Sequence, residues 1–377
     1  MLKGFYMTLM VGPVLPVPVP QVVLDALTSV TVTTTAEHRV PSGFELNFTL
    51  DNRSPLHTIF LLSGGAIVPL MRVIIIVTIN GSPTVLMDGV ITKQEVVGGS
   101  HSGQSTLRIS GVDLTEVMNL IDTSGIPFPA MPIEARIALI ILKYAVFGVI
   151  PLVVPTILLD VPIPVSMIPR QQGKDLEYVH MLSHKVGYVF YIEPGPAPGL
   201  NTAYFGPEIK IGIPQKPLNI DMDAHTNVDS LSFEFNADTK KLPIVWYYNE
   251  ITKIPIPIPI PDFNPLQPPL GLVPPLPLNV EMLTGTAKLS PVGAAAEGLA
   301  EAARSSDAVV GRGTLDVLRY GQPLKARSLV GVRGAGMAFD GLYYVKTVSH
   351  QIGRGEYKQS FTLTRNGLIS ILPTVPV

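Results

Sequence analysis

Cysteine is absent from the 377 residues, which excludes a disulfide framework, thiolate metal sites and a cysteine nucleophile. Charge is scarce as well: 15% of the residues are charged, against about 25% in a typical soluble domain. The net charge is -2 and no basic run occurs, so the composition does not support nucleic-acid binding. Because 46% of the residues are hydrophobic, we expect much apolar surface to be buried between domains or subunits.

Two apolar stretches resemble membrane-directed segments. In residues 1–20, prolines at positions 13, 16, 18 and 20 interrupt the apolar run and no small-residue cleavage site follows, which argues against a signal peptide. Residues 137–159 are long enough to span a bilayer. Lys143 lies inside this stretch, and Gly148 with its following prolines predicts a helix of about ten to fifteen residues that stops there and continues as an extended segment. We expect no membrane span; a membrane-anchored assembly protein using residues 137–159 is the alternative.

Alternating polarity predicts strands near the start of the chain. Residues 44–50 alternate with period two, as in a half-buried strand. Residues 73–79 are almost entirely β-branched, and Asn80-Gly81 gives a turn signal that leads into a partner strand over 85–92. Residues 105–110 alternate again. These segments predict an antiparallel barrel.

Helical signals follow. Asp113–Glu116 fits a helix start, and residues 174–187 form an amphipathic pattern ending at Gly187. Strand patterns over 188–192 and 202–205 complete a small α+β domain.

The barrel pattern resumes in residues 230–236 and 242–248. Prolines at alternate positions then remove the backbone N–H groups that a β-ladder needs. An extended or polyproline-type excursion is therefore predicted, and its isoleucine side chains are expected to pack against a neighbouring surface. Residues 294–303 predict a short Ala-rich helix. The predicted fold is mainly β with an α+β insert: two antiparallel β-barrel domains plus a small α+β middle domain. The predicted boundaries are a Pro-rich lead-in (1–29), a first barrel (30–115), the middle domain (116–227), a second barrel (228–367) with its Pro-rich excursion (254–278), and a tail (368–377).

Two groups of metal-binding residue types occur. Glu177, His180 and His184 fall at i, i+3 and i+7 of the predicted helix, and the histidines have the spacing that can clamp zinc. No glutamate follows His180, and the surface of an amphipathic helix explains the same spacing. The Asp-x-Asp-x-His run at 221–225 lacks the further ligands and central glycine of a calcium loop. We predict no metal site and no cofactor.

Catalytic motifs are incomplete. Gly331–Gly336 lacks the Walker lysine and no helix pattern follows it, so it predicts a glycine-rich turn between strands. Ser349-His350 lies within a predicted strand, and no G-x-S-x-G elbow occurs. We therefore expect no catalytic residues and no enzyme.

The most specific signal lies in residues 313–367, where short Val-, Tyr-, Thr- and Phe-rich runs alternate with glycine turns. This block resembles the C-terminal part of the phage late control gene D family, the baseplate hub proteins of contractile tails and related injection systems. The matching runs are Gly313–Asp316, Arg319–Gly321, Leu329–Val332, Asp340–Val345, Val348–His350, Gly355–Phe361 and Arg365–Gly367, with upstream matches at Val40–Phe48, Asn52–Leu56, Pro169–Asp175 and Val186–Phe190.

The resemblance implies a structural hub subunit that forms a homotrimeric ring between a hexameric inner tube and a trimeric spike. Each subunit would carry two barrels like those of the tail tube protein, so three copies would present a pseudo-sixfold surface. No spike repeat follows Gly367, so we expect a separate spike protein as partner, beside the inner tube protein and other baseplate components. The expected location is a phage tail-like particle assembled in the bacterial cytoplasm. The alternative of a tail-tip lytic enzyme would need a carboxylate pair and a sugar cleft.

Overall fold

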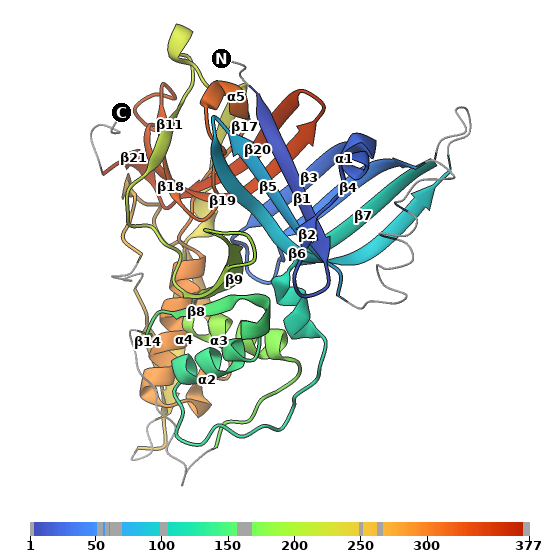
Figure 1. The fold of residues 1–377 in the computed structure, drawn as a ribbon. Helices are drawn as coiled ribbons and strands as arrows, with labels where there is room; N and C mark the ends of the chain where they lie inside the picture. The colour runs from blue at the N-terminus through green and yellow to red at the C-terminus, as the bar shows by residue number, and fades with distance from the viewer. Residues whose placement is uncertain are drawn as a thin grey trace.

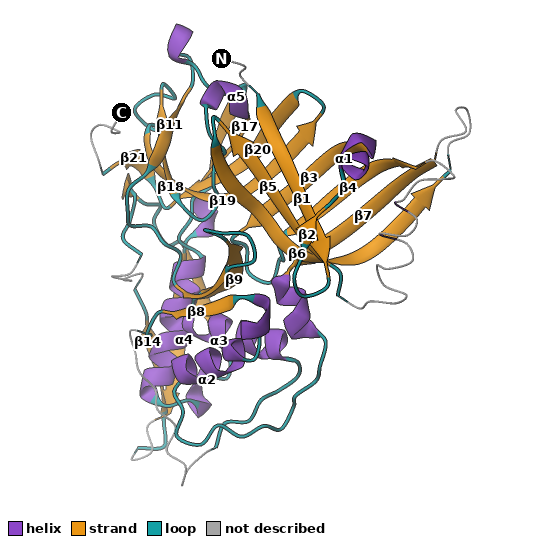
Figure 2. Ribbon diagram, in the orientation of Figure 1, coloured by secondary structure: helices purple, strands orange, loops and turns teal. Residues whose placement is uncertain are grey.

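The computed structural model describes residues 4–50, 56, 60, 70–98, 105–156, 168–248, 252–261 and 267–371. Figure 1 shows a large curved sheet at one end of the molecule, and Figure 2 shows most of the helical structure gathered at the other end. The architecture is mainly β with a smaller α+β part, which confirms the predicted fold class. The domain boundaries themselves stay predictions.

The N-terminal group contains the strands predicted over 44–50, 73–79, 85–92 and 105–110, together with further strands. β1 (Phe5–Gly12) pairs along its whole length with β5 (Arg72–Ile79), although it lies within the predicted lead-in. The prolines begin only after Gly12, so nothing prevents β1 from joining the ladder. Asn80 and Gly81, with φ of 50° and 81°, close the predicted hairpin. The other elements here are β2 (Val17–Pro18), α1 (Gln21–Ala26), β3 (Leu27–Thr35), β4 (Gly43–Leu50), β6 (Ser82–Val97) and β7 (Ser105–Asp113).

The C-terminal group joins the first group edge to edge. β19 (Gly341–Gly353) pairs with β3 as well as with its own neighbours, and hydroxyl pairs Thr33–Ser349 and Thr35–Thr347, each at 3.0 Å, cross the seam. The two predicted barrels therefore share one 13-stranded sheet and one hydrophobic core. The other elements are β11 (Gln215–Asn219), β12 (Ser230–Phe235), β17 (Val309–Asp316), α5 (Val317–Tyr320), β18 (Leu329–Arg333) and β20 (Glu356–Arg365).

The helical end begins where Asp113 accepts the backbone N–H of Thr115 and caps a 3-10 turn. The predicted helix over 174–187 is confirmed as α3, which ends at Gly187 in the left-handed conformation. The elements are η2 (Leu114–Asn119), α2 (Ile133–Leu142), η3 (Ala145–Phe147), β8 (Val149–Val153), α3 (Asp175–Val186), β9 (Val189–Pro194) and β10 (Asn201–Gly206), with η4 (Asp223–His225) further on.

The apolar stretch at 137–159 does not form one long helix. α2 covers ten residues, η3 continues the path, and Gly148 at φ 72° ends it before β8, as predicted. In the ranges that the structure describes, no helix is both long and apolar enough to cross a membrane. Residues 157–159 of the alternative lie outside the described residues.

Replacing Gly148 by alanine is expected to lower the free energy of unfolding by about 2–4 kcal/mol. A Cβ atom there would lie 2.0 Å from the carbonyl oxygen of Gly199, in addition to the positive φ. Gly125 has φ 92° but no atom within 4 Å of an added Cβ, so Gly125→Ala should cost only about 1 kcal/mol of strain. Urea unfolding of both variants measures the difference, and equal losses would contradict the close approach of Gly148 to Gly199.

The segment 242–248 corrects one prediction. Instead of joining the second barrel, β13 (Lys241–Tyr248) lies between β14 and β16 in a separate sheet. Pro243 cannot donate to a ladder, and with Val245 it is buried; Val245 packs in a small core with Ala294 of α4. The other elements are η5 (Ala237–Thr239), β14 (Pro255–Pro259), β15 (Gly271–Val273), β16 (Asn279–Met282), η6 (Thr286–Lys288), α4 (Pro291–Arg304) and β21 (Leu368–Ser370).

The extended conformation predicted for the Pro-rich excursion is confirmed in β14, which pairs antiparallel with β13. Ile260 donates its backbone N–H to the carbonyl of Pro243 (2.9 Å), so a non-proline residue supplies the ladder donor. Prolines at alternate positions cannot donate to a further strand, which protects this edge of the sheet. Ile256 and Ile258 stay 40% and 39% exposed.

Candidate functional site

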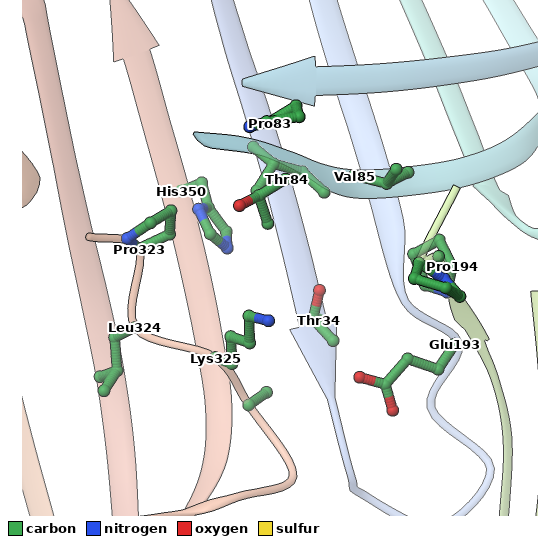
Figure 3. Close-up of a pocket in the computed structure, with 14 residues that line it drawn as sticks. Thr34, Pro83, Thr84, Val85, Glu193, Pro194, Pro323, Leu324, Lys325 and His350 are labelled. Carbon is green, nitrogen blue, oxygen red and sulfur yellow. The ribbon is translucent and has the colours of Figure 1, made fainter. Parts of the chain in front are cut away.

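A pocket of about 250 Å³ lies where segments far apart in the sequence meet (Figure 3). It is lined from β3, the start of β6, the β9–β10 turn, the loop before β18, and β19. Lys325 from the loop before β18 and Glu193 from the end of β9 extend into the cavity, with the Thr34 side chain between them and that of Thr84 beside His350 (Figure 3). His350 lines the pocket from β19. The site therefore combines a cation, a carboxylate, hydroxyls and an imidazole.

The proton of the His350 ring can be assigned from its surroundings. Leu324 donates its N–H to Gln359 Oε1, and Gln359 Nε2 donates to the carbonyl of Leu324 (both 2.9 Å), which fixes the amide orientation. The same Nε2, which is only a donor, lies 3.2 Å from His350 Nδ1. Nδ1 therefore accepts, also from the Tyr357 hydroxyl at 2.7 Å, and the proton sits on Nε2. Burial lowers the pKa of His350 to about 3, so the ring is neutral at neutral pH.

This arrangement argues against base catalysis by His350. An imidazole that carries its proton on Nε2 and accepts at Nδ1 has no free acceptor with which to activate a hydroxyl. The neighbouring Ser349 lies on the opposite face of the strand and shares a hydrogen bond with Thr33. The structure therefore separates the two residues of the Ser-His pair.

The histidines of α3 meet a third histidine that sequence reasoning missed. The ring centre of His38, in the β3–β4 loop, lies 5.5 Å from that of His180 and 5.4 Å from that of His184. The Glu177 carboxylate instead accepts the backbone N–H of Lys174 at the helix start. Among the described residues, no three His, Asp or Glu side chains are arranged to hold a metal ion. Burial lowers the pKa of His38 and His180 to about 4 and also lowers that of His184, so we treat this histidine cluster as neutral at pH 7.

The remaining candidates are turns. The Asp-x-Asp-x-His run at 221–225 is mostly exposed, and its last three residues form the short 3-10 turn η4. Gly334 and Gly336, with φ of 87° and 88°, connect β18 to β19, which confirms the predicted glycine-rich turn.

A buried ion pair that the sequence did not reveal joins the sheet to the helical end. Arg72 binds Asp88 through two hydrogen bonds of 2.6 and 2.7 Å, and both side chains are almost completely buried. Arg72 also donates to the carbonyl of Phe147 (2.9 Å), and Asn201 donates to Asp88 (2.9 Å). The pair therefore fixes η3 and β10 to strands β5 and β6.

No protein-family model and no curated protein sequence matches the chain. Among solved structures, a tail protein of Neisseria meningitidis MC58 matches with a TM-score of 0.63 at 13% identity, over 97% of this chain and 98% of its own. The 43 kDa tail protein of prophage MuSo2 from Shewanella oneidensis gives 0.61 at 15% identity, over 96% and 98%. An E. coli component of the type VI secretion system gives 0.51 at 10% identity, over 93% and 78%. The chain has the fold of phage tail proteins.

Several runs that carry the family resemblance have structural roles in this tail-protein fold. Asp316 accepts the backbone N–H groups of Leu318 and Arg319 and so caps α5. The buried Arg365 donates to the carbonyls of Gly367 (2.7 Å) and Asp340 (2.9 Å). These side chains stabilise turns and strand ends. The residues that carry the family resemblance therefore maintain the fold.

Proposed function

We propose that the chain is a structural baseplate hub subunit of a contractile phage tail-like injection particle, in which three copies form a ring that joins a hexameric inner tube to a trimeric spike. The observation that carries the proposal is the pairing of β3 with β19, which places two groups of strands side by side in one rigid sheet. Three such subunits contain six strand groups, which matches a sixfold partner on one side. The full-length likeness to two phage tail proteins supports the same role.

The exposed surface of the chain supports assembly. Large hydrophobic side chains remain exposed on the described part of the chain, among them Leu15 (81%), Ile213 (96%) and Met337 (81%), and such side chains are candidates for burial between subunits. Strand β12 forms an edge of the large sheet with most of its residues exposed, and a closed ring would cover such edges.

The separate β14-β13-β16 sheet would serve other contacts. Val280 and Met282 on β16 are 56% and 61% exposed, and Tyr248 on β13 is 40% exposed. Exposed apolar side chains on one small sheet are typical of protein contacts. We propose that this sheet packs against other baseplate components.

Light scattering on the purified chain at several concentrations tests the ring. A particle of three times 40.6 kDa, seen as a ring when imaged and bound by purified tube and spike proteins, is the expected result. A chain that stays monomeric alone and with both partners would overturn the proposal. Recovery only in detergent would favour the membrane-anchored alternative, and cleavage of peptidoglycan would favour the lytic one.

A further inference from the structure

The pocket of Figure 3 has a charge arrangement that a hub role does not explain. Lys325, from the loop before β18, and Glu193, from the end of β9, extend toward one another across the cavity (Figure 3). An exposed ion pair between them would gain little, because solvent screens it and both side chains lose freedom, so the two charges stay available to a ligand. Gln215 and Lys325 exchange two backbone–side-chain hydrogen bonds of 2.8 and 2.9 Å that fix the Lys325 backbone, and Glu193 is fixed by its pairing within strand β9.

The third polar group of the pocket is held as a donor. His350 is 5% exposed, and its Nδ1 is occupied by Tyr357 and Gln359, so only the Nε2–H remains for the cavity. Lys325 also only donates, whereas the Glu193 carboxylate only accepts. One side of the pocket therefore suits a carboxylate and the other an ammonium group.

We propose that this pocket binds a small zwitterion, an α-amino acid or an equivalent ammonium–carboxylate pair, with the carboxylate at Lys325 and His350 Nε2–H and the ammonium at Glu193. Thr34 and Thr84 supply hydroxyls that can donate to the first group or accept from the second. A volume of about 250 Å³ lies just below the roughly 300–1,000 Å³ of drug-sized sites, which restricts the ligand to a small molecule. The same pair of charges occurs in a free amino acid and in adjacent acidic and basic side chains of a polypeptide.

Calorimetric titration of the full chain distinguishes these sources. Glycine, L-alanine and L-serine are the zwitterionic probes, acetate and ethylammonium each carry one of the two charges, and a capped Lys-Glu dipeptide presents both charges on side chains. We expect the best amino acid to bind with a Kd of about 1 mM or tighter, and each single-charge probe to bind at least about tenfold more weakly. Tighter binding of the dipeptide than of any free amino acid would assign the site to a protein partner carrying that charge pair.

Matched variants localise the binding. Glu193 and Lys325 are exposed, so Glu193→Gln and Lys325→Met should fold normally and weaken alanine binding at least about tenfold. Lys93→Met and Glu95→Gln alter an exposed ion pair of 3.1 Å farther along β6 and should leave binding unchanged. Alanine should also shift the ¹⁵Nε2 resonance of His350, which a mere surface ion pair would not. The proposal is wrong if alanine binds no better than acetate, or if the pocket and control variants lose binding equally.

Discussion

Asp88→Ala is expected to lower the free energy of unfolding by about 3–5 kcal/mol, because it leaves the Arg72 guanidinium buried without its counter-charge. Three further segments depend on this guanidinium, since it donates to the carbonyls of Val14 (2.9 Å), Phe147 (2.9 Å) and Gly199 (3.3 Å). The loss should therefore extend from the sheet to the helical end. Urea unfolding at pH 7, followed by circular dichroism, measures it.

Two controls separate the buried pair from charge in general. Glu95→Ala removes one partner of an exposed pair and should cost less than about 1 kcal/mol. The double variant Arg72→Met/Asp88→Leu removes both buried charges and should recover much of the loss, since a buried ion pair adds little net stability over well-packed apolar groups. Equal losses for Asp88→Ala and Glu95→Ala would contradict the structure.

Acidification from pH 7 to pH 5 is expected to destabilise the folded chain through histidines that are buried or half-buried in it. Burial lowers the pKa of His38 and His180 to about 4 and that of His350 to about 3. The unfolded chain, with histidine pKa values near 6.5, then binds more protons than the folded chain between pH 6.5 and 4. The stabilisation is present above pH 6.5 and is lost as the pH falls toward 4, by about 1–2 kcal/mol at pH 5 for the fully buried His350. His38 and His180 are partly exposed, so solvent screening makes their contribution smaller.

The charges around the histidine cluster reinforce this direction. Arg39 lies close enough to lower the pKa of all three histidines, and Arg304 lowers that of His38 and His184. Glu301, which acts in the opposite sense on His184, is already paired with Arg304 at 2.6 Å. Protonation would thus add positive charge beside two arginines, at the contact between the β3–β4 loop and α3.

Unfolding free energies of variants across pH 4.5–8 test the prediction. His180→Phe should reduce the pH dependence of the unfolding free energy by the contribution of one histidine. Substitution of the exposed His225 by glutamine should leave that pH dependence unchanged. If the His180→Phe curve runs parallel to that of the unaltered chain, the cluster does not titrate as described.

Local sequence patterns predicted most strands and helices, because the polarity pattern of a segment depends on which of its own side chains are buried. Alternation over residues 44–50 reappears as a strand with alternating burial, and Gly148 and Gly187 end the helical paths as expected. The strand pattern over 242–248 was misleading. It correctly indicates a strand but does not say which sheet the strand joins.

The candidate site was less accessible to sequence reasoning. His350 was visible only as part of a Ser-His pair, whose members lie on opposite faces of β19. Lys325 and Glu193 carried no signal at all, because their meeting at one pocket depends on a loop and a strand that are far apart in the chain. His38 likewise meets α3 across 142 positions of sequence, counting from His38 to His180.

The sequence by itself determined the class of fold, the positions of turns and helix ends, and the extended state of the Pro-rich edge. These depend on backbone φ, on missing N–H donors and on side-chain period, all of which are local properties. Only the tertiary structure decided that β3 and β19 join two strand groups into one sheet, that Arg72 and Asp88 meet in the interior, and that His350 presents Nε2–H to a pocket. Each outcome depends on which distant segment pairs with a free strand edge, neutralises a buried charge or hydrogen-bonds an imidazole nitrogen. A local sequence pattern carries no information about that partner.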